Sequence, residues 1–577
     1  MLLFHRLRRP PGPDRPPAER GASRRRRVLS GAVTGLAGLV VLAALIVPDN
    51  ISRLPPGHSW PSALLRIPIE GILGAAILLS LPVRARRRVA VGLGAALGLL
   101  TIVKILNMGF FTVLARQFNP VLDWALLDDG LTVLRDSVGD AGATGAVIGA
   151  VLLAVALLVG MPLAVRRLAG TVTGHPTATR RTATAGAAAW VTFALLGTGL
   201  VPGVFVASDT AAALAYSTAL TVPQGVQDRR AFAREAAVDA YRDTAGDRLL
   251  TGLRGKDVVF TFVESYGRTA LEDPKYAAEV GAVLRSGHQE LTRAGYSARS
   301  GYLTSSTAGG GSWLAHATFQ SGLWINNEQR YRTLVSGERL TLTGAFHRAA
   351  VRTVGIEPGI TYAWPEGEFY GFDQVYDSHT LGYRGPAFSW ATMPDQFTLS
   401  AFERLERGRS DRGPLMAEVT LVSSHTPWTP VPRLLDWDEV GDGSVYAPMV
   451  AAGPTAGEVW KDAKRVRAAY RESIEYSLNS IISYVRTYGD DDLVMVFLGD
   501  HEPAPIITGD SGSRDVPITV VSRDRTVLDR IAGWNWTDGL APAPTAPVWR
   551  MDAFRDRFLA AFGGPAPAGR QQALGPR

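Results

Sequence analysis

Five apolar stretches in the first 206 residues constrain the fold of this chain more than any other feature. They lie near residues 28–48, 62–83, 89–112, 144–165 and 183–206. Each approaches or exceeds the ~20 apolar residues that a helix needs to cross a bilayer. The sequence therefore predicts a membrane domain of five transmembrane helices over residues 28–206. Because the chain has 577 residues, it is also too long for one ordinary domain.

Arginine clusters predict how these helices are oriented. They lie at residues 24–27, at 84 and 86–88, and at 166, 167, 180 and 181. Loops rich in Lys and Arg stay in the cytoplasm, and all three clusters fall on one side of a five-span chain. The sequence thus predicts a multi-pass protein of the cell membrane, with everything after about residue 207 outside the cytoplasm. Arg66 and Glu70 lie four residues apart in the second stretch, where they could form an ion pair or contact a lipid head group or the outer domain.

The remaining segments are assigned from composition. Residues 1–27 are rich in Pro and Arg and are expected to be a disordered cytoplasmic tail on anionic lipid. They lack the features of a cleaved signal peptide, so the first span is expected to remain as an anchor. Residues 207–250 are expected to be a helical connector, 251–562 an extracytoplasmic domain, and 563–577 a disordered tail. The net charge of +7 is explained by the arginine clusters, and no nucleic-acid motif is present.

Two apolar segments of the outer domain end in side chains that can bind metal. VVFTFV at 258–263 is followed by Glu264, and LVMVFLG at 493–499 is followed by Asp500 and His501. Open α/β sheets place their chemistry at the carboxyl ends of strands. Carboxylate and imidazole donors suit manganese, zinc or magnesium. The pattern predicts a divalent metal site, whereas the alternative is that Glu264 caps a strand and Asp500-His501 opens a turn.

A serine at a predicted helix start is the candidate nucleophile. Ser312 follows Gly309, Gly310 and Gly311 and opens the segment SWLAHATFQSG. The positive end of a helix favours an anion beside it, and glycines let the backbone approach a ligand closely. An ordinary N-cap serine would give the same pattern. Ser306 and Thr307 are alternative nucleophiles in the same loop.

These motifs resemble those of the alkaline phosphatase superfamily. Counting from Ser312, the pair Ser321-Gly322 falls where the sulfatase signature C-x-P-S-R-x-x-x-x-T-G ends. Within the superfamily the chain is most similar to membrane-anchored lipoteichoic acid synthases and to phosphoglycerol or phosphoethanolamine transferases. The resemblance implies a doubly wound α/β domain and a manganese or zinc ion held by Glu264, Ser312, Asp500 and His501. The chain has no cysteine and no Pro-Ser-Arg after Ser312, so the formylglycine route of sulfatases is not expected.

The resemblance also suggests residues that contact substrate. MAEVTLV at 416–422 runs into a Ser-His-x-Pro stretch, which makes His425 the candidate for binding the phosphate or protonating the leaving oxygen. His316 lies four residues after Ser312 and so shares its helical face. Further candidates line the expected substrate groove or clamp a phosphate, although each could instead be a local packing or salt-bridge residue: Arg268, Trp364, Tyr370, Asp373, Arg384 and Trp390.

The function implied by this resemblance is an enzyme of the sulfatase superfamily, acting as a phosphotransferase or phosphodiesterase. The resemblance implies transfer of a phosphoryl-linked head group from a membrane lipid to a cell-envelope acceptor through a phosphoseryl intermediate. One alternative is a sulfatase-like hydrolase that uses water as the acceptor. Another is a catalytically inactive domain that binds an envelope polymer.

Overall fold

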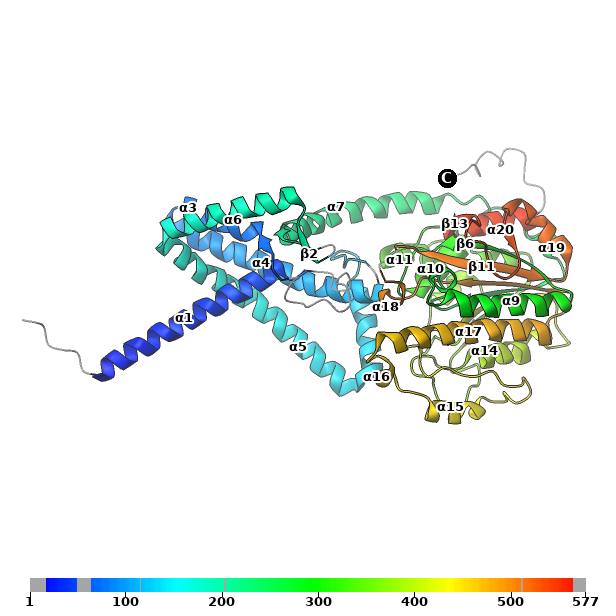
Figure 1. Ribbon diagram of the computed structural model, residues 1–577. Helices are drawn as coiled ribbons and strands as arrows, with labels where there is room; N and C mark the ends of the chain where they lie inside the picture. Colours follow the sequence, from blue (N-terminus) through cyan, green and yellow to red (C-terminus); the bar gives the residue numbers. More distant parts are fainter. Residues whose placement is uncertain (1–16, 49–63, 115, 202–203, 510–511, 564–577) are drawn as a thin grey trace, which may run out of the picture. The chain divides into compact units, whose positions relative to one another are not determined.

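The protein is described from a computed structural model that covers residues 17–48, 64–114, 116–201, 204–509 and 512–563. The chain forms two compact units. The first contains residues 1–108 and 127–220, and the second contains residues 109–126 and 221–577. The second unit thus includes a short segment, 109–126, from the middle of the region assigned to the membrane domain. Figure 1 shows the elements of both units with their labels.

Three helices of the described chain are long and apolar enough to cross a membrane: Arg25–Ile46, Val83–Leu114 and Gly139–Gly174. They belong to α1 (Pro17–Ile46), α4 (Val83–Leu114) and α5 (Ala125–Gly174). The other two expected spans form shorter apolar segments, α3 (Ile69–Ser80) and part of α6 (Pro176–Leu196). The 12 residues of α3 rise only ~18 Å at 1.5 Å per residue, less than the ~30 Å of a hydrocarbon core.

The expected tails are only partly covered by the described residues. Helix α1 begins at Pro17, so residues 17–27 are helical rather than disordered, which fits the high helix propensity of arginine. Residues 1–16 and 564–577 lie outside the described residues. The expected connector contains helix α7, Thr210–Ala237.

Contacts within the first unit define the directions of its helices. Lys104 Nζ near the end of α4 donates to the carbonyls of Ala44 and Val47 at the end of α1, both at 2.9 Å, so α1 and α4 run in the same direction. Gly94 of α4 lies against Pro162 of α5 and Gly98 against Leu157, so these two helices are antiparallel. Glycine allows such close backbone contact.

Side-chain contacts also join the start of α1 to the end of α5. Arg167 Nη2 donates to the Ser30 carbonyl at 2.7 Å and Nε to Thr34 Oγ1 at 2.9 Å. The described arginines at 25–27 and those at 166 and 167 therefore lie at one end of this unit. Because α4 runs parallel to α1, the arginines at 84 and 86–88 at its start belong to that same end.

Arg66 and Glu70 bind the backbone around α7 rather than each other. Arg66 donates to the carbonyls of Phe205 and Ile46 and to Thr210 Oγ1. Glu70 Oε1 accepts from the backbone N–H of Ala212 in the first turn of α7, at 2.8 Å. A carboxylate at a helix N-terminus is favoured by the helix dipole. These two charges therefore fix the start of the connector.

The second unit is built on one mixed sheet with the order β12-β6-β11-β10-β5-β9-β7-β8, and β13 pairs with β6. Strands β10, β5, β9, β7 and β8 are mutually parallel, whereas β11 is antiparallel to both of its neighbours. The strands are β5 (Asp257–Val263), β6 (Ser297–Thr304), β7 (Arg352–Glu357), β8 (Gln374–Asp377), β9 (Leu415–Leu421), β10 (Leu493–Gly499), β11 (Asp515–Ser522), β12 (Thr537–Asp538) and β13 (Val548–Arg550).

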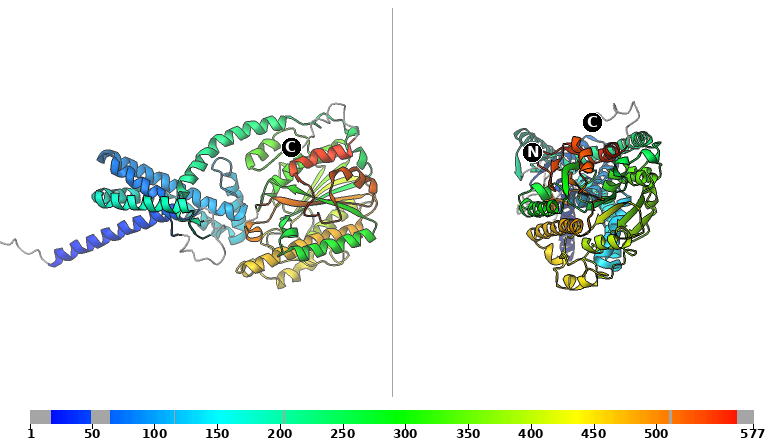
Figure 2. Two further views of the ribbon diagram at one scale, coloured as in Figure 1. Left: turned by 45° about the horizontal axis from the view of Figure 1, so that its top comes forward. Right: turned by 90° about the vertical axis from the view of Figure 1, so that its right-hand side faces the viewer.

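Helices cover both faces of this sheet (Figure 2). Val259 and Val263 of β5 pack into one core with residues of α9 (Ala277–Arg293), α14 (Asp395–Phe402) and α17 (Ala463–Tyr488). Phe260 and Phe262 point to the other face, which is covered by α10 (Ser312–Ser321), α12 (Leu342–Arg348), α19 (Arg525–Arg530) and α20 (Phe554–Phe562). Burial on both faces explains why the central strands are continuous apolar runs. The doubly covered α/β architecture agrees with the expected fold class.

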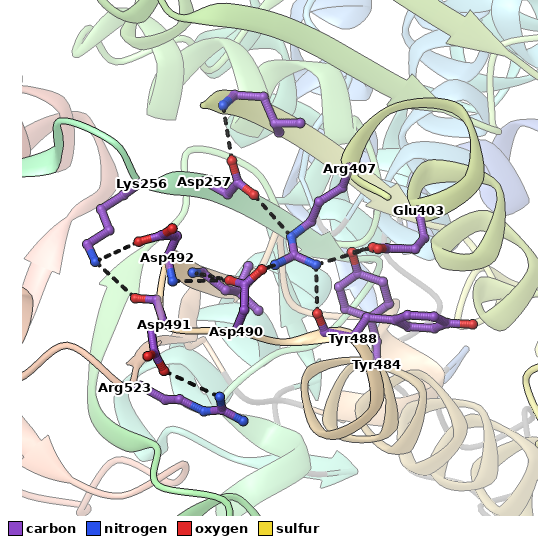
Figure 3. A network of polar contacts seen from close by, with 12 residues as sticks. Lys256, Asp257, Glu403, Arg407, Tyr484, Tyr488, Asp490, Asp491, Asp492 and Arg523 are labelled. Carbon is purple, nitrogen blue, oxygen red and sulfur yellow. Dashed lines mark hydrogen bonds and ion pairs between the residues drawn. The ribbon is translucent and has the colours of Figure 1, made fainter. Parts of the chain in front are cut away.

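A network of ion pairs lies at the end of the sheet where the parallel strands begin (Figure 3). The buried Arg407 guanidinium contacts Asp257, the first residue of β5, at 3.3 Å, and Asp490 at 2.6 Å. Arg407 also donates to the Tyr488 carbonyl at 2.7 Å. A buried charge needs such partners, because desolvation costs several kcal/mol per ion. The functional candidates lie at the opposite edge, where the strands end.

Candidate metal and nucleophile site

Three buried side chains meet at the carboxyl ends of two adjacent parallel strands. Glu264 follows β5, and Asp500 and His501 follow β10. Their ligand atoms all lie within 4.8 Å of one another, with His501 Nε2 at 3.3 Å from Glu264 Oε1 and at 3.5 Å from Asp500 Oδ2. In the part of the chain that the structure describes, they form a group that could hold a metal ion. The alternatives of a plain strand cap and a turn do not account for this convergence.

Hydrogen bonds fix the orientation of these groups. Asp500 Oδ1 accepts from the backbone N–H of Ser265 at 2.8 Å and of His501 at 2.7 Å. His501 Nδ1 donates to the carbonyl of Glu502 at 2.9 Å, which turns Nε2 toward the two carboxylates. A ligating histidine normally has its other ring nitrogen held in this way. The donor set of two carboxylates and one imidazole fits manganese or zinc.

The charges of the cluster also fit a divalent cation. Burial and the nearby charge of Glu264 raise the pKa of Asp500 to about 7. Burial acts in the same direction on Glu264, but His501 and His425 outweigh it and lower the pKa of Glu264 to about 2. Two buried carboxylates at this distance repel each other when both are ionised. A cation between them would remove that cost.

Ser312 places its hydroxyl in the same cluster. Its Oγ donates to Glu264 Oε2 at 2.9 Å and lies 3.2 Å from His501 Nε2. Gly311, with φ of 80°, is the N-cap of α10, so Ser312 is the first helical residue and its side chain caps nothing. The hydroxyls of the alternatives are used elsewhere, since Ser306 donates to the Leu314 carbonyl and Thr307 to the Gly310 carbonyl.

The glycine loop before Ser312 is packed on both sides. Gly309 has φ of 76°, and a Cβ there would lie 2.2 Å from the carbonyl oxygen of Val113, in the segment 109–126. The Gly309 N–H donates to the Glu502 carbonyl at 2.7 Å, the oxygen that also accepts from His501 Nδ1. The left-handed conformation and the close approach both explain why glycine is needed here. One carbonyl thus links the glycine loop to the metal-site histidine.

His425 follows β9, the neighbour of β5 on the other side. Its ring stacks on Trp390 with centroids 3.6 Å apart, and its Nδ1 donates to the Thr426 carbonyl at 2.5 Å. Burial lowers the pKa of His425 although the charge of Glu264 acts to raise it. The imidazole is therefore mostly neutral near pH 7, with Nε2 free of this backbone bond. Ser424 Oγ donates to the Glu264 carbonyl at 2.6 Å and so ties the two strand ends together.

The structure brings His316 close to the cluster and stacks Trp390 on His425, whereas Arg268, Asp373 and Arg384 have other surroundings. His316 stacks on Phe262, two residues before Glu264, with ring centroids 3.7 Å apart. Arg268 pairs with Glu272 and Asp515, which is the salt-bridge alternative. Asp373 accepts from the Thr353 N–H at the start of β7, at the edge of the sheet opposite the metal ligands. Trp364 packs on Tyr370, and Arg384 is exposed.

Sequence reasoning missed two residues of this region. Glu418 lies in the middle of β9, is 4% exposed, and binds His316 Nδ1 at 2.9 Å. A lone acid inside the apolar run MAEVTLV was the signal that could have found it. Glu502 follows His501 directly, and its carbonyl sets the orientation of that ring. Such a backbone role leaves no signal in the sequence.

No protein-family model matches the chain, and no curated protein matches it. Similar solved structures exist at low identity. The lipoteichoic acid synthase LtaP from Listeria monocytogenes is 15% identical, covers 51% of this chain and 70% of its own, and has a TM-score of 0.33. A protein in the alkaline phosphatase superfamily from Vibrio parahaemolyticus is 14% identical, covers 59% of this chain and 76% of its own, and has a TM-score of 0.35. The zinc complex of the C-terminal periplasmic domain of EcEptC from Escherichia coli is 11% identical, covers 54% of this chain and 84% of its own, and has a TM-score of 0.37.

Proposed function

We propose that this protein transfers a phosphoryl-linked head group, such as phosphoglycerol, from a membrane lipid to a cell-envelope acceptor in a metal-dependent reaction. The observation that carries this proposal is the position of Ser312 Oγ, within 3.2 Å of both Glu264 and His501. A hydroxyl at a helix N-terminus, inside a cluster suited to a divalent cation, is arranged for attack on a phosphate. An envelope-polymer binder would need no such hydroxyl.

Glu264, Asp500 and His501, together with the Ser312 hydroxyl, would hold the ion, which we propose to be manganese or zinc. When bound, it would lower the pKa of the serine hydroxyl and draw charge off the phosphate. Ser312 Oγ would lose its proton to water and then form a bond to phosphorus, while the bond from phosphorus to the diacylglycerol oxygen breaks. The product of this half-reaction is a phosphoseryl intermediate and diacylglycerol.

His425 is assigned the proton transfers of both half-reactions. Its Nδ1 is held by the Thr426 carbonyl, so Nε2 is the atom that can exchange a proton. In the first step the protonated minority of His425 gives its Nε2 proton to the departing diacylglycerol oxygen, which leaves the imidazole neutral. In the second step it takes one from the acceptor hydroxyl that attacks the phosphoserine, as one acid–base group can serve both directions. With water as the acceptor, the same steps give a phosphodiesterase.

We also propose five membrane segments with the second unit outside the cytoplasm. The parallel directions of α1 and α4 support this, because the chain between them must return, and α3 is the apolar helix in that interval. The position of the described arginine clusters at one end of the first unit agrees with the positive-inside rule. Protease added to spheroplasts should release a fragment that begins between residues 207 and 250, while the arginine-rich leader stays protected. Cleavage of the leader from outside would contradict this orientation.

Mass spectrometry of Ser312 tests the reaction directly. The purified full-length protein would be incubated with mixed phospholipids and manganese, and the mass of an adduct on the Ser312 peptide names the group transferred. Thr307→Ala is the matched control, since it removes a hydroxyl from the same loop and should still form the adduct. An unmodified Ser312, together with an active Ser312→Ala protein, would refute the proposal. Faster turnover of an aryl sulfate than of a phosphodiester would favour the sulfatase-like alternative.

A further inference from the structure

Glu418 is a buried acid held on both oxygens beneath the nucleophile helix. Its Oε1 contacts His316 Nδ1 at 2.9 Å, and Oε2 accepts from the side-chain amide of Gln320, one turn further along α10. Gln320 Oε1 in turn accepts from the backbone N–H and the hydroxyl of Thr343 in α12, at 2.9 and 3.1 Å. These bonds fix the orientation of the Glu418 carboxylate, with Oε1 toward His316 and Oε2 toward Gln320.

His316 is fixed from two sides and has one nitrogen left over. Its ring lies on Phe262 with an angle of 18° between the planes, and Nδ1 is bound to Glu418. Nε2 is buried and has no hydrogen-bond partner among the described residues. A buried polar atom without a partner destabilises the folded protein, so we expect a bound ligand to supply the partner of Nε2.

The location of His316 indicates which ligand that is. Ser312 lies one helical turn before His316 on the same face of α10. Phe262, on which the imidazole rests, lies two residues before Glu264 on the same face of β5. His316 therefore shares the helical face of Ser312 and rests on the strand that Glu264 follows, and its charge acts on Asp500. A phosphate held at Ser312 is the ligand that this position suggests.

The charges around His316 favour its protonated form. Burial acts to lower its pKa, but the hydrogen bond and charge of Glu418, with smaller contributions from Glu357 and Asp500, raise the pKa of His316 above its usual value. His501 is the cationic group that faces it and opposes this effect. Protonated His316 has an N–H at Nε2 and can therefore act as a donor.

We propose that Glu418 is a positioning residue, which holds His316 so that its Nε2–H donates to an anionic oxygen of the substrate phosphodiester at Ser312. This inference rests on the proposed function, because it names a second cationic contact at the same site. Glu418 touches no substrate and acts only through His316. The pair of Glu418 and His316 gives the site a charged hydrogen-bond donor that is separate from the metal ligands.

Glu418→Gln in the full-length protein tests this role, because glutamine keeps the size of the side chain and removes its charge. With phosphatidylglycerol carrying a fluorescent head group as substrate, kcat/KM at pH 8 should fall about tenfold, the typical effect of one charge-assisted hydrogen bond. The alkaline limb of the pH profile should move to lower pH, because His316 loses its proton more easily. A merely structural role would leave that limb in place.

A double-mutant cycle separates Glu418 from other effects. In a His316→Gln background, Glu418→Gln should cause no further loss, since it acts through His316. Glu406→Gln is the matched control, because it removes another buried carboxylate, one that pairs with Arg352 at the opposite edge of the sheet. It should leave the pH profile unchanged. If Glu418→Gln does not fold, His316→Gln alone should remove the alkaline limb.

Binding of sn-glycerol 1-phosphate to the manganese-loaded protein distinguishes a failure of this inference from a failure of the proposed function. Isothermal titration calorimetry should show a Kd about tenfold higher for Glu418→Gln than for the parent protein. A raised Kd would support the role of this pair even if no phospholipid modifies Ser312. An unchanged Kd, an unmoved alkaline limb, or additive losses in the cycle would overturn the inference even if phospholipid turnover is confirmed.

Discussion

Replacing Asp500 by asparagine should change stability in opposite directions with and without metal. In the metal-free protein, burial and Glu264 raise the pKa of the Asp500 carboxyl from 3.8 to about 7. The difference corresponds to about 4 kcal/mol at pH 8, where the group is ionised in both the folded and the unfolded state. The substitution also weakens the charge-assisted bonds that Asp500 Oδ1 accepts from the N–H groups of Ser265 and His501, so we expect Asp500→Asn to be more stable by about 2–4 kcal/mol.

The pH dependence of this effect has a defined sign. A carboxyl whose pKa is higher in the folded state binds its proton more tightly there, so stability is lost as the pH rises from about 4 to 7. The metal-free parent protein should therefore lose stability over this range, and Asp500→Asn should lose less. Manganese reverses the order, because a ligand at 100 times its Kd stabilises the folded state by about 2.7 kcal/mol and the variant lacks one of the ligands.

Thermal unfolding followed by tryptophan fluorescence would measure both effects in the full-length protein. The conditions are EDTA at pH 5 and pH 8, and manganese at pH 8. Asp395→Asn is the matched control, since Asp395 is another buried acid whose pKa burial raises, to about 6, and it should respond equally with and without metal. A lower melting temperature for Asp500→Asn than for the parent in EDTA at pH 8, or equal stabilisation of both by manganese, would refute the reasoning.

Three further outcomes are expected. Ser312→Ala should abolish phospholipid turnover while lowering the melting temperature by only a few degrees, because it removes one hydrogen bond worth about 1.5–3 kcal/mol. Activity and unfolding assays on the same sample would show this. Retained turnover would contradict the nucleophile assignment. Trp390→Leu should slow turnover without changing the affinity for manganese, since the Trp390 ring stacks on His425 and not on a proposed metal ligand. A loss of manganese binding would contradict this expectation. Arg407→Ala should destabilise the second unit by about 1–3 kcal/mol, because it removes the buried guanidinium that bonds Asp257, Asp490 and the Tyr488 carbonyl. Asp257 keeps its ion pair with Arg412, which limits the loss. Turnover per folded molecule should be unchanged, and an intact melting temperature would show that the network contributes little.

The sequence predicted that Glu264, Asp500 and His501 would lie together because of where they stand on the strands. Apolar runs that end in Glu264 and in Asp500-His501 indicate parallel neighbours whose ends meet. The number of long membrane helices was harder to predict. Hydropathy treats the stretches 62–83 and 183–206 alike, but Pro68 and Pro82 bound α3, which has 12 residues. Helix α6 has 21 residues, but its first half is polar and Gly197, with φ of 60°, ends it, so its apolar part is short.

The predicted substrate contacts illustrate a different limit. Asp373 and Arg384 lie in an aromatic stretch whose position in the chain does not reveal which edge of the sheet it reaches. The structure shows Asp373 at the start of β7, paired with His347 at 3.2 Å. Glu418 could have been noticed as an acid in an apolar strand, but its partner His316 lies 102 residues away. Contacts of that range depend on strand order, which the sequence does not state.

The contact of Gly309 with Val113 has a consequence for any attempt to study this protein as a soluble fragment. A fragment that starts near residue 251 keeps every proposed metal ligand yet lacks the segment 109–126. Its glycine loop then loses the backbone wall on one side, so metal should still bind while Ser312 is held less firmly. The cost of Gly309→Ala should differ accordingly: in the whole chain the new methyl group meets the Val113 carbonyl, whereas in the fragment only the left-handed backbone opposes it. The part of the chain that positions Ser312 therefore extends beyond the sheet and its covering helices, because it includes the segment 109–126.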